Sequence, residues 1–298
     1  ELPYFIRECQ EIIKIDETNF NEGYKLLNLF KESMSDNEIF RNNSLFLSTI
    51  STLGFGKLSK EIVESLTSII VVNGLGDNSL FQQAGRSLQD EIRKKYIVDL
   101  LKSGDIGIED ITTIEVSVKD YQNKYEISEN NTLDNDKKKK LVVTTRKKFG
   151  KNSEFIENEQ YPLRNMESEG TIKLFELSPF IYDALKSNRP LIIDEFDARF
   201  HPLLTKKIVE LFNSPHNKSS QLIFVTHDTN LLSADLLRRD QIDFVEKDKF
   251  GASHLYSLVE FKGIRNSNSF EKDYINGRYG AIPFLGDFNK LLHFENNA

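Results

Sequence analysis

The chain has one cysteine in 298 residues, Cys9, and this scarcity excludes two kinds of structure. A lone cysteine cannot close an intrachain disulfide, and it cannot supply a cysteine-based zinc site. Long apolar runs are absent as well, because the most apolar segment, Ile69–Val72, is far shorter than the roughly 20 residues that cross a bilayer as a helix. No signal-type sequence opens the chain. These absences predict a cytoplasmic protein without a membrane segment.

The charge balance is mildly acidic, since 46 acidic residues against 39 lysines and arginines give a net charge of −7. That balance argues against a surface that coats nucleic acid over its whole area, although it allows a local basic track. One candidate track is Lys137–Lys140, which follows the polar stretch Ser128–Asp136. Four lysines can bind phosphate backbones, but beside acids on a loop they are more often a solvated tip. Nucleic acid therefore stays among the candidate partners.

The stretch that organises the chain is Leu191–Asp197, in which an aliphatic and β-branched run ends among three acids. Such a run is typical of a strand buried on both faces, and open α/β sheets bind their ligands at the carboxyl ends of these strands. In a nucleotide-hydrolysing site Asp194 would hold Mg²⁺ and Glu195 would polarise the attacking water. The alternative is a plain acidic turn, in which Asp197 caps a helix that opens near Pro202.

Two further segments favour the nucleotide site. Glu167–Lys173 contains a serine, a glycine and a threonine at the start of a helical pattern, where backbone N–H groups and the helix dipole attract anions. Gln221–Thr226 is a second buried-strand run, and it places His227 at the carboxyl edge of a neighbouring strand before a helix begins at Thr229. Alone, the first segment is more often a plain helix cap, and His227 is more often an ordinary partly buried histidine.

The order and spacing of these segments resemble the signature motif, Walker B strand, D-loop and switch histidine of ABC-type ATPase heads. More closely, they resemble the bacterial AAA-type, ABC-like ATPases of the RloA/AbiL kind, which are associated with phage abortive infection and restriction loci. The segments that carry the resemblance are Glu167–Thr171, Ile193–Leu203, Thr226–Asp228 and Gly277–Pro283. The resemblance implies an α/β fold, namely a P-loop NTPase head with a parallel sheet flanked by helices.

The resemblance also implies a chemistry. ATP and Mg²⁺ would be the cofactors, with Asp194 as the metal ligand. Glu195 would be the catalytic group that aligns water, and His227 would contact the γ-phosphate during hydrolysis. The protein would then be an ATPase subunit of a bacterial anti-phage, abortive-infection-like defence system, and it would control a separately encoded nuclease or effector.

Dimerisation follows from the same resemblance. A single head places its own signature away from its own P-loop, so two heads must meet with ATP sandwiched between them. Ser168, Gly170 and Thr171 would reach the phosphate bound by the opposite subunit, while Asp197 would run along the dimer seam. ATP binding would thereby switch association on, and hydrolysis would release it.

One required motif has no counterpart in the chain. A phosphate-cradling loop G-x-x-x-x-G-K-[ST] is needed for nucleotide binding in this family. Gly54–Leu58 has a Gly-Lys pair, but it has no glycine five residues earlier and has Leu58 where the Mg²⁺-binding hydroxyl should be. Because the chain begins at Glu1 without a methionine, we expect a fragment whose Walker A lobe lies ahead of it.

Two other functions are compatible with the motifs. An ATPase of the SMC and recombination-repair type would bind DNA, but it would need long uninterrupted heptads, and none occurs between residues 1 and 100. A nuclease could use Asp194, Glu195 and Asp197 around two metals, yet no separate acidic or histidine cluster completes such a site.

The pattern divides the chain near residue 100. Residues 1–100 are predicted to be mostly helical, because Phe5, Cys9, Ile12 and Ile13 recur at helical spacing. The resemblance implies that this region is a helical insertion for partner contact. Within this region Asn73–Ser79 is predicted to be a turn that ends a helix rather than a cofactor loop. Residues 101–298 are predicted to be the carboxyl-terminal part of the head.

Within residues 101–298 the alternation of strands and helices favours a parallel sheet. The first predicted elements are an antiparallel pair of strands at 111–118 and 141–145 and a helix over 172–185 that is interrupted or restarted at Ser178-Pro179. Strands at 191–194 and 221–226 follow, with a helix from about Pro202 between them. An edge hairpin is predicted at 242–246 and 253–258. Gly277–Gly280 is predicted to be a structural tail.

Overall fold

The structure is a computed structural model that describes residues 3–33, 43–54, 56–104, 107–117, 138–264, 269–283 and 286. The chain divides into two compact units. One consists of Glu1–Val72, Asp183–Ile192 and Ser219–Ile223, and the other of Asn73–Tyr182, Ile193–Lys218 and Phe224–Ala298. The polar stretch Ser128–Asp136 and Lys137 lie outside the described residues. No helix in the described part of the chain is both long and apolar enough to cross a membrane.

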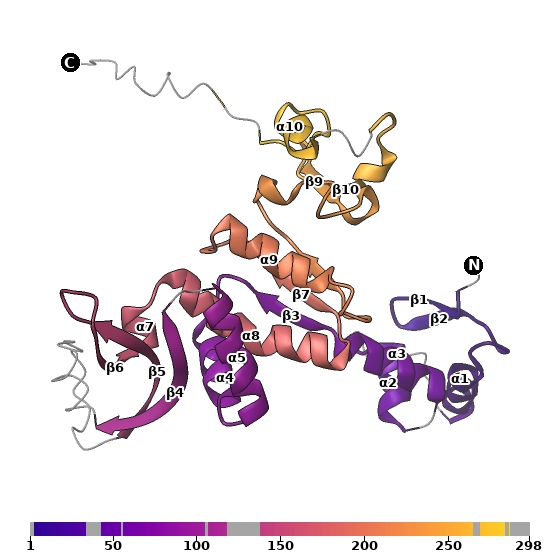
Figure 1. Ribbon diagram of the computed structural model, residues 1–298. Coiled ribbons are helices and arrows are strands. Elements are labelled where there is room, and N and C mark those ends of the chain that lie inside the picture. Colours follow the sequence, from indigo (N-terminus) through magenta and orange to yellow (C-terminus); the bar gives the residue numbers. More distant parts are fainter. Residues whose placement is uncertain are drawn as a thin grey trace, which may run out of the picture. The chain divides into compact units, whose positions relative to one another are not determined.

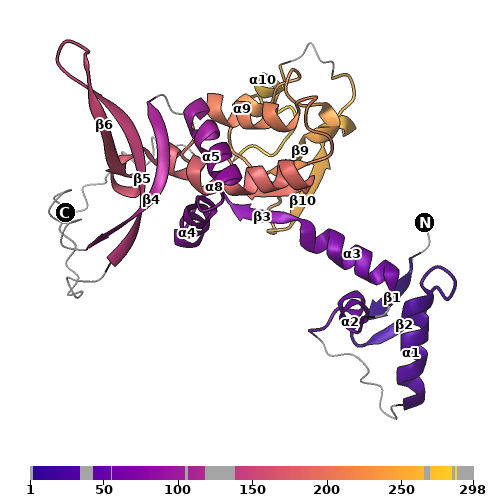
Figure 2. The same ribbon diagram turned by 60° about the horizontal axis from the view of Figure 1, so that its bottom comes forward.

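The described part of the amino-terminal segment of the first unit contains a hairpin and three helices, which lie side by side in Figures 1 and 2. Strands β1 (Phe5–Glu8) and β2 (Glu11–Ile15) pair in antiparallel fashion, and helices α1 (Asn21–Ser33), α2 (Phe46–Thr52) and α3 (Lys57–Ser68) follow. The prediction of a helix through Phe5, Cys9, Ile12 and Ile13 is therefore wrong. Cys9 has a φ of 52° and turns the chain between the strands, so Phe5 and Ile12 reach the same aromatic core.

The Gly56-Lys57 pair marks the start of α3 and is not a phosphate loop. The carboxylate of Glu22 accepts hydrogen bonds from the backbone amides of Leu58 (3.2 Å) and Ser59 (2.5 Å). A helix amino terminus offers such amides to an anion, and here a side chain of the same unit takes that place. The structure thus agrees with the exclusion of this segment as a Walker A motif.

A parallel sheet of three strands has the order β3 (Ile70–Asn73), β7 (Leu191–Asp194) and β8 (Leu222–Phe224). Ile70 N donates to Pro190 O and Gly74 N donates to Asp194 O, so residue numbers rise together along β3 and β7. The same holds for β7 and β8, because Leu191 N donates to Gln221 O and Val225 N donates to Ile193 O. The predicted α/β class with a parallel sheet is confirmed, whereas β3 was not predicted.

Helix α8 (Glu169–Ser187) is continuous, although a break was predicted at Ser178-Pro179. A proline inside a helix leaves the carbonyl four residues earlier without its backbone donor. That carbonyl belongs to Phe175, and the Ser178 hydroxyl donates a 2.7 Å hydrogen bond to it. The buried serine therefore supplies the donor that Pro179 lacks, and the helix can continue.

Helices α4 (Asn78–Ser87) and α9 (Pro202–Phe212) of the second unit begin at side-chain caps. Helix α4 is capped by Asp77, whose carboxylate accepts from Leu80 N, and α5 (Glu91–Gly104) follows it. Helix α9 begins at the predicted proline, with His201 as its cap. Among the described residues, the remaining helical segments are α7 (Leu163–Met166), α10 (Phe270–Ile275) and three short 3₁₀ turns, Thr229–Leu231, Arg239–Gln241 and Leu258–Glu260. The helix predicted at Thr229 is thus a single 3₁₀ turn.

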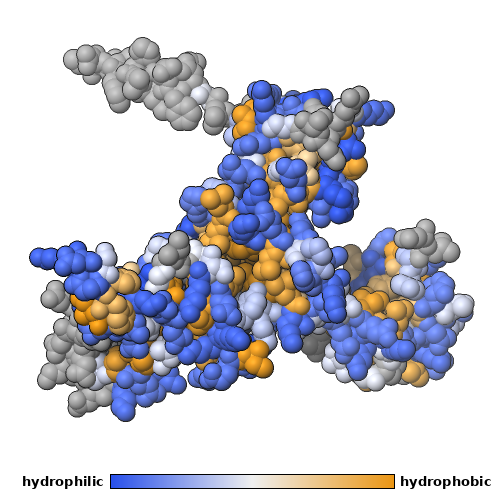
Figure 3. All heavy atoms as spheres, in the orientation of Figure 1, coloured by the Kyte–Doolittle hydropathy of each residue, from blue (hydrophilic) through white to orange (hydrophobic). Residues whose placement is uncertain are grey.

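An antiparallel sheet has the order β4 (Ile108–Ser117), β5 (Lys138–Phe149) and β6 (Phe155–Pro162). Ile111 pairs with Thr144, which pairs in turn with Tyr161, so the predicted two-stranded pair is confirmed and gains a third strand. Figure 3 shows apolar residues at the surface over this sheet.

The carboxyl-terminal tail packs on the predicted hairpin, which consists of β9 (Asp243–Lys247) and β10 (Ser253–Ser257). Tyr279 is buried in the aromatic cluster that contains Phe244. The Tyr256 hydroxyl donates a 2.7 Å hydrogen bond to Tyr279 O, and a Cβ on Gly280 would lie 2.7 Å from that hydroxyl. Only glycine fits there, so the Gly277–Gly280 segment has a structural role.

Candidate nucleotide site

Strand β7 ends in the segment Asp194–Phe200, which we call the acid turn. Two of its non-glycine residues have left-handed backbone, Glu195 with a φ of 51° and Arg199 with a φ of 65°. Asp194 is exposed at the strand end, and one of its oxygens, Oδ1, accepts from Glu195 N at 3.0 Å. The turn closes on itself, because Ala198 N donates to Glu195 O and Phe200 N donates to Asp197 O. The acids are therefore presented at the carboxyl edge of the sheet, where the sequence predicts them.

Asp197 joins the acid turn to the segment that follows β8. Its Oδ1 accepts from the Thr226 hydroxyl (2.6 Å) and from the backbone amide of His227 (3.1 Å). Burial alone would raise the pKa of Asp197, but these hydrogen bonds outweigh it and hold that pKa below its ordinary value. The imidazole of His227 is exposed, so it is free to face a ligand beside the acids.

The start of α8 lies against the same turn. Ser168 is exposed, its Oγ accepts from Thr171 N at 3.1 Å, and it also bonds the Thr171 hydroxyl at 2.8 Å. Thr171 itself is buried. A Cβ on Gly170 would lie 3.0 Å from Arg199 O, and the Arg199 guanidinium donates to Glu169 at 2.8 Å. Of the three residues predicted to contact phosphate, Ser168 is thus exposed, Gly170 is half-buried and Thr171 is buried.

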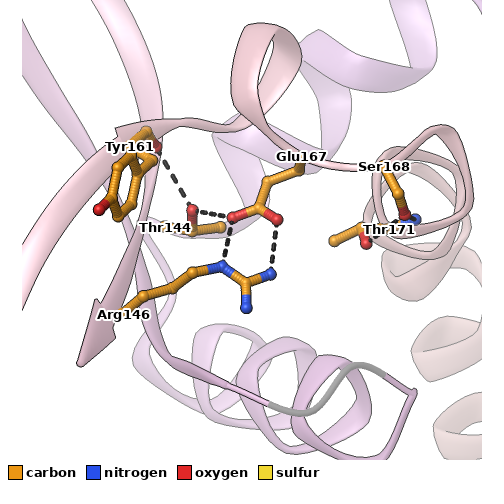
Figure 4. Close-up of polar contacts among 6 residues, drawn as sticks. All are labelled: Thr144, Arg146, Tyr161, Glu167, Ser168 and Thr171. Atoms are coloured by element: carbon orange, nitrogen blue, oxygen red, sulfur yellow. Dashed lines mark hydrogen bonds and ion pairs between the residues drawn. The ribbon is translucent and has the colours of Figure 1, made fainter. Parts of the chain in front are cut away.

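Glu167, the residue before that serine, anchors α8 to the antiparallel sheet (Figure 4). Its carboxylate accepts two hydrogen bonds from the Arg146 guanidinium, at 2.9 Å from Nε and 2.6 Å from Nη2, and a third from the Thr144 hydroxyl. The Glu167 side chain is only 5% exposed, so these hydrogen bonds replace the water that its carboxylate loses on burial. The sequence gives no signal for this contact, because Arg146 is 21 residues away on β5.

Replacing Arg146 with alanine is expected to destabilise the protein by about 3 kcal/mol, because a buried carboxylate would lose its bidentate cation. Urea unfolding measures the loss. Lys147→Ala is the matched control, since the neighbouring Lys147 pairs with Glu109 while their side chains are 48% and 37% exposed, and its cost should stay below about 1 kcal/mol. Equal stabilities of the two variants would contradict the anchoring role of Glu167.

The turn after β3 supports the backbone of the acids. Gly74 N donates to Asp194 O at 2.7 Å, and a Cβ on Gly74 would lie 2.5 Å from Glu195 O and 2.6 Å from Asp194 O. Only glycine allows this approach. The prediction that Asn73–Ser79 ends a helix is therefore wrong, because the segment joins a strand to α4. The β-branched run before an Asn-Gly pair was the available signal for that strand.

Two charged residues of α8 point inward and were missed by the sequence analysis. Lys173 is 1% exposed and donates to the carbonyls of Glu195 (3.0 Å), Phe196 (2.9 Å) and Ala198 (2.6 Å). Glu176 is also buried, and its Oε2 has no hydrogen-bond partner among the residues that the structure describes. Burial raises the pKa of Glu176 to about 7. Both residues interrupt an otherwise apolar helix, which was the only signal for them in the sequence.

The structure thus brings the predicted residues into two groups. Asp194, Glu195, Asp197 and His227 lie at the ends of β7 and β8, and Ser168 and Gly170 begin the helix that packs on the acid turn. Within the described residues, no group of three or more histidine, cysteine, aspartate or glutamate side chains is arranged to hold a metal ion. Asp197 is instead engaged by Thr226 and the His227 amide.

Residues 90–233, just under half of the chain, match the family model described as "AAA domain, putative AbiEii toxin, Type IV TA system". This segment is similar to an AAA-type ATPase domain. It contains the start of α8, the acid turn and His227. The α/β fold fits a P-loop NTPase, and ATPases of this type generally use ATP and Mg²⁺.

The other comparisons add little. No match was found among curated proteins. Among solved structures, the chain is similar to the crystal structure of the Smc head domain with a coiled coil and joint derived from Pyrococcus yayanosii, at 12% identity over 89% of this chain and with a TM-score of 0.38. The chain spans 44% of the length of that structure.

Proposed function

We propose that the chain is the carboxyl-terminal part of an ATP-binding and ATP-hydrolysing head, in which the acid turn supplies the metal ligand and the catalytic carboxylate. The observation that carries the proposal is the acid turn itself. It presents Asp194 and Glu195 at the carboxyl edge of a parallel sheet, beside the segment after β8 that bears His227. The similarity of residues 90–233 to an AAA domain supports the same activity.

The donor set at the acid turn fits Mg²⁺-ATP. Mg²⁺ takes one or two carboxylates and fills its other positions with water and phosphate oxygens. Asp194 is exposed and uses Oδ1 toward Glu195 N, which leaves Oδ2 for a metal. When bound, Mg²⁺ would neutralise charge on the phosphates during transfer. A two-metal nuclease would need more carboxylates in the same place, and Asp197 already binds Thr226 and the His227 amide.

Three residues of the chain have separate roles in the proposed hydrolysis. Glu195 accepts a proton from, or aligns, the attacking water, because it is a carboxylate next to the metal ligand. His227 is exposed and donates to a γ-phosphate oxygen. Asp197 holds the two strand ends together through Thr226 and the His227 amide, so that Glu195 and His227 keep a fixed separation. This role of Asp197 adds to the place at the dimer seam that the resemblance implies.

Ser168 and the Gly170 amide act on a second head in this proposal. Ser168 is exposed at the amino terminus of a 19-residue helix, where an anion is favoured. Arg199 O lies against Gly170 at the helix start, and the Arg199 guanidinium pairs with Glu169. As the resemblance implies, a phosphate that reaches Ser168 would come from a separate subunit, with ATP between two copies. Thr171 would contribute only by orienting Ser168 through their hydrogen bond.

A phosphate loop must come from another segment or another chain, and one sheet face offers a place for it. Along β3 and β8, Val71 is 70% exposed and Ile223 is 52% exposed, although Ile70 and Val72, the neighbours of Val71 on β3, are buried. Parallel sheets normally have both faces covered by helices. The uncovered apolar face supports a further lobe that packs there and carries the Walker A lysine.

Calorimetric titration with Mg²⁺-ATP tests this requirement. The 298-residue chain alone should bind ATP weakly and hydrolyse none, because its sequence has no phosphate-loop motif to cradle the β- and γ-phosphates. A protein that includes a P-loop lobe should do both. Tight binding by the isolated chain would contradict the proposal, since the acid turn and α8 would then be sufficient.

The biological setting of the proposal is anti-phage defence. Two observations support this setting. Glu167–Thr171, Ile193–Leu203 and Gly277–Pro283 resemble segments of ATPases from abortive-infection loci. The description of the matching family model also names an AbiEii toxin. The ATP-dependent dimer would control an associated nuclease or effector. Counting phage plaques on cells that carry the complete locus, with wild-type protein or with Glu195→Gln, tests this setting.

A further inference from the structure

Lys173 is the most deeply placed charge near the acid turn. It lies in the second turn of α8, five residues after Ser168, and its side chain is 1% exposed. The ammonium group donates three hydrogen bonds, to the carbonyls of Glu195, Phe196 and Ala198. A lysine ammonium has three donors, and all three are used on one short segment of backbone.

The segment that Lys173 binds is strained. Glu195 and Arg199 both have left-handed φ values, which non-glycine residues rarely adopt and which persist only when their surroundings fix them. The three carbonyls lie between these two residues. Because φ at Glu195 sets the direction of its Cα–Cβ bond, a contact that fixes the backbone also fixes where the carboxylate begins.

The lysine uses its hydrogen bonds on carbonyls, whereas a buried lysine usually pairs with a carboxylate. Its surroundings are the Phe200 ring, 4.5 Å from Nζ, and the charged groups of Asp197, Glu195, Glu176 and Arg199. Burial lowers the pKa of Lys173 to about 8, and the carboxylates only partly offset that effect. A buried ammonium of this kind costs stability, which suits a role in positioning rather than in folding.

We propose that Lys173 is a positioning residue for ATP hydrolysis, which holds the backbone of the acid turn so that Glu195 keeps the orientation needed to align water. The inference rests on the proposed ATPase function. It also joins the two halves of the site, because the helix that carries Lys173 begins at the serine proposed to contact the γ-phosphate of the second head. A shift of α8 on ATP binding would therefore move the carbonyl of Glu195.

The test measures two properties of the complete, P-loop-containing protein. Steady-state kinetics give kcat and KM for ATP, with kcat normalised to the nucleotide-binding fraction, and hydrogen–deuterium exchange reports on the amides of Phe196, Ala198 and Phe200. Lys173→Met keeps the length of the side chain and removes its donors. We expect kcat to fall about 10- to 100-fold with KM within about threefold, because small misplacements of a reacting group carry costs of that order. Exchange at the three amides should rise at least about tenfold.

A second variant keeps the test decisive if Lys173→Met does not fold. Lys173→Arg retains the charge, but a planar guanidinium cannot direct three donors from one point, so kcat should still fall by at least about fivefold. Lys186→Met, on the exposed last turn of the same helix, is the matched control and should behave as wild type.

Wild-type kcat and wild-type exchange in a folded Lys173 variant would overturn the inference. So would a loss of thermal stability with an unchanged rate per nucleotide-binding molecule, since that is the result of a purely structural role. If the complete wild-type protein hydrolyses no ATP, the proposed function fails instead. In that case the exchange rates of the acid turn in the Lys173 variants are the only test of the positioning role. Rates equal to those of the wild type would overturn it.

Discussion

Glu195→Gln is expected to abolish ATP turnover in the complete protein while ATP stays bound. The substitution is nearly isosteric, so the strand end is preserved and Asp194 remains able to hold Mg²⁺. The neutral amide cannot accept a proton from the attacking water, and loss of a general base typically lowers a rate by about 10²- to 10⁴-fold, roughly 3 to 5 kcal/mol of barrier. Phosphate release and filter retention of labelled ATP measure the two properties separately.

Two companion variants show that the effect belongs to Glu195. Asp194→Asn should weaken Mg²⁺-ATP binding itself, because it removes the charge of the metal ligand. His227→Ala should slow hydrolysis by removing a phosphate contact without changing metal binding, and the Thr226–Asp197 hydrogen bond should survive because the His227 contact uses its backbone amide. Normal turnover by Glu195→Gln would mean that the acid turn is structural.

Ser168→Arg is expected to prevent the ATP-dependent association of two heads and to leave nucleotide binding by one subunit nearly intact. Ser168 is exposed at the start of α8, and a long cation there would occupy the place of the phosphate held by the second head. Light scattering with ATP in the Glu195→Gln background, where hydrolysis cannot dissolve the dimer, measures the mass. We expect a dimer before the substitution and a monomer after it.

Two controls separate this effect from damage to the helix. Ser168→Ala removes the cap bond to Thr171 N, which costs about 1 kcal/mol, but adds no bulk, so ATP-dependent dimers should still form at higher protein concentration. Ser187→Arg places the same cation at the exposed far end of α8 and should leave association unchanged. A dimer of unchanged mass for Ser168→Arg would show that Ser168 only caps its helix.

The sequence predicted those parts of the site that local pattern determines. The run Leu191–Asp194 ends abruptly in acid, and this pattern fits one environment, namely the end of a buried strand. The same reasoning placed β4, β5, the β9–β10 hairpin and the start of α9 at Pro202. In each of these segments the residues that decide the structure are neighbours in the chain.

The sequence did not predict contacts between distant segments. Lys173 and Glu176 were assigned no role, because only the fold brings the acid turn and Gly76 to their side of α8. Pro179 predicted a break that the Ser178 hydroxyl prevents. Phe5 and Ile12 fitted a helical period by chance, since a four-residue strand and a tight turn at Cys9 give a similar spacing.

In the proposed mechanism, the carboxyl ends of β7 and β8 form an Mg²⁺-ATP site that a P-loop lobe and a second head complete. The most direct measurement is an experimental structure of the complete Glu195→Gln protein grown with ATP and Mn²⁺, whose anomalous signal locates the metal. We predict the metal beside Asp194, the γ-phosphate near His227, and Ser168 of the second copy on the far side of that phosphate. A nucleotide bound away from the acid turn would contradict the account. So would a metal that Asp194 neither coordinates directly nor contacts through a metal-bound water.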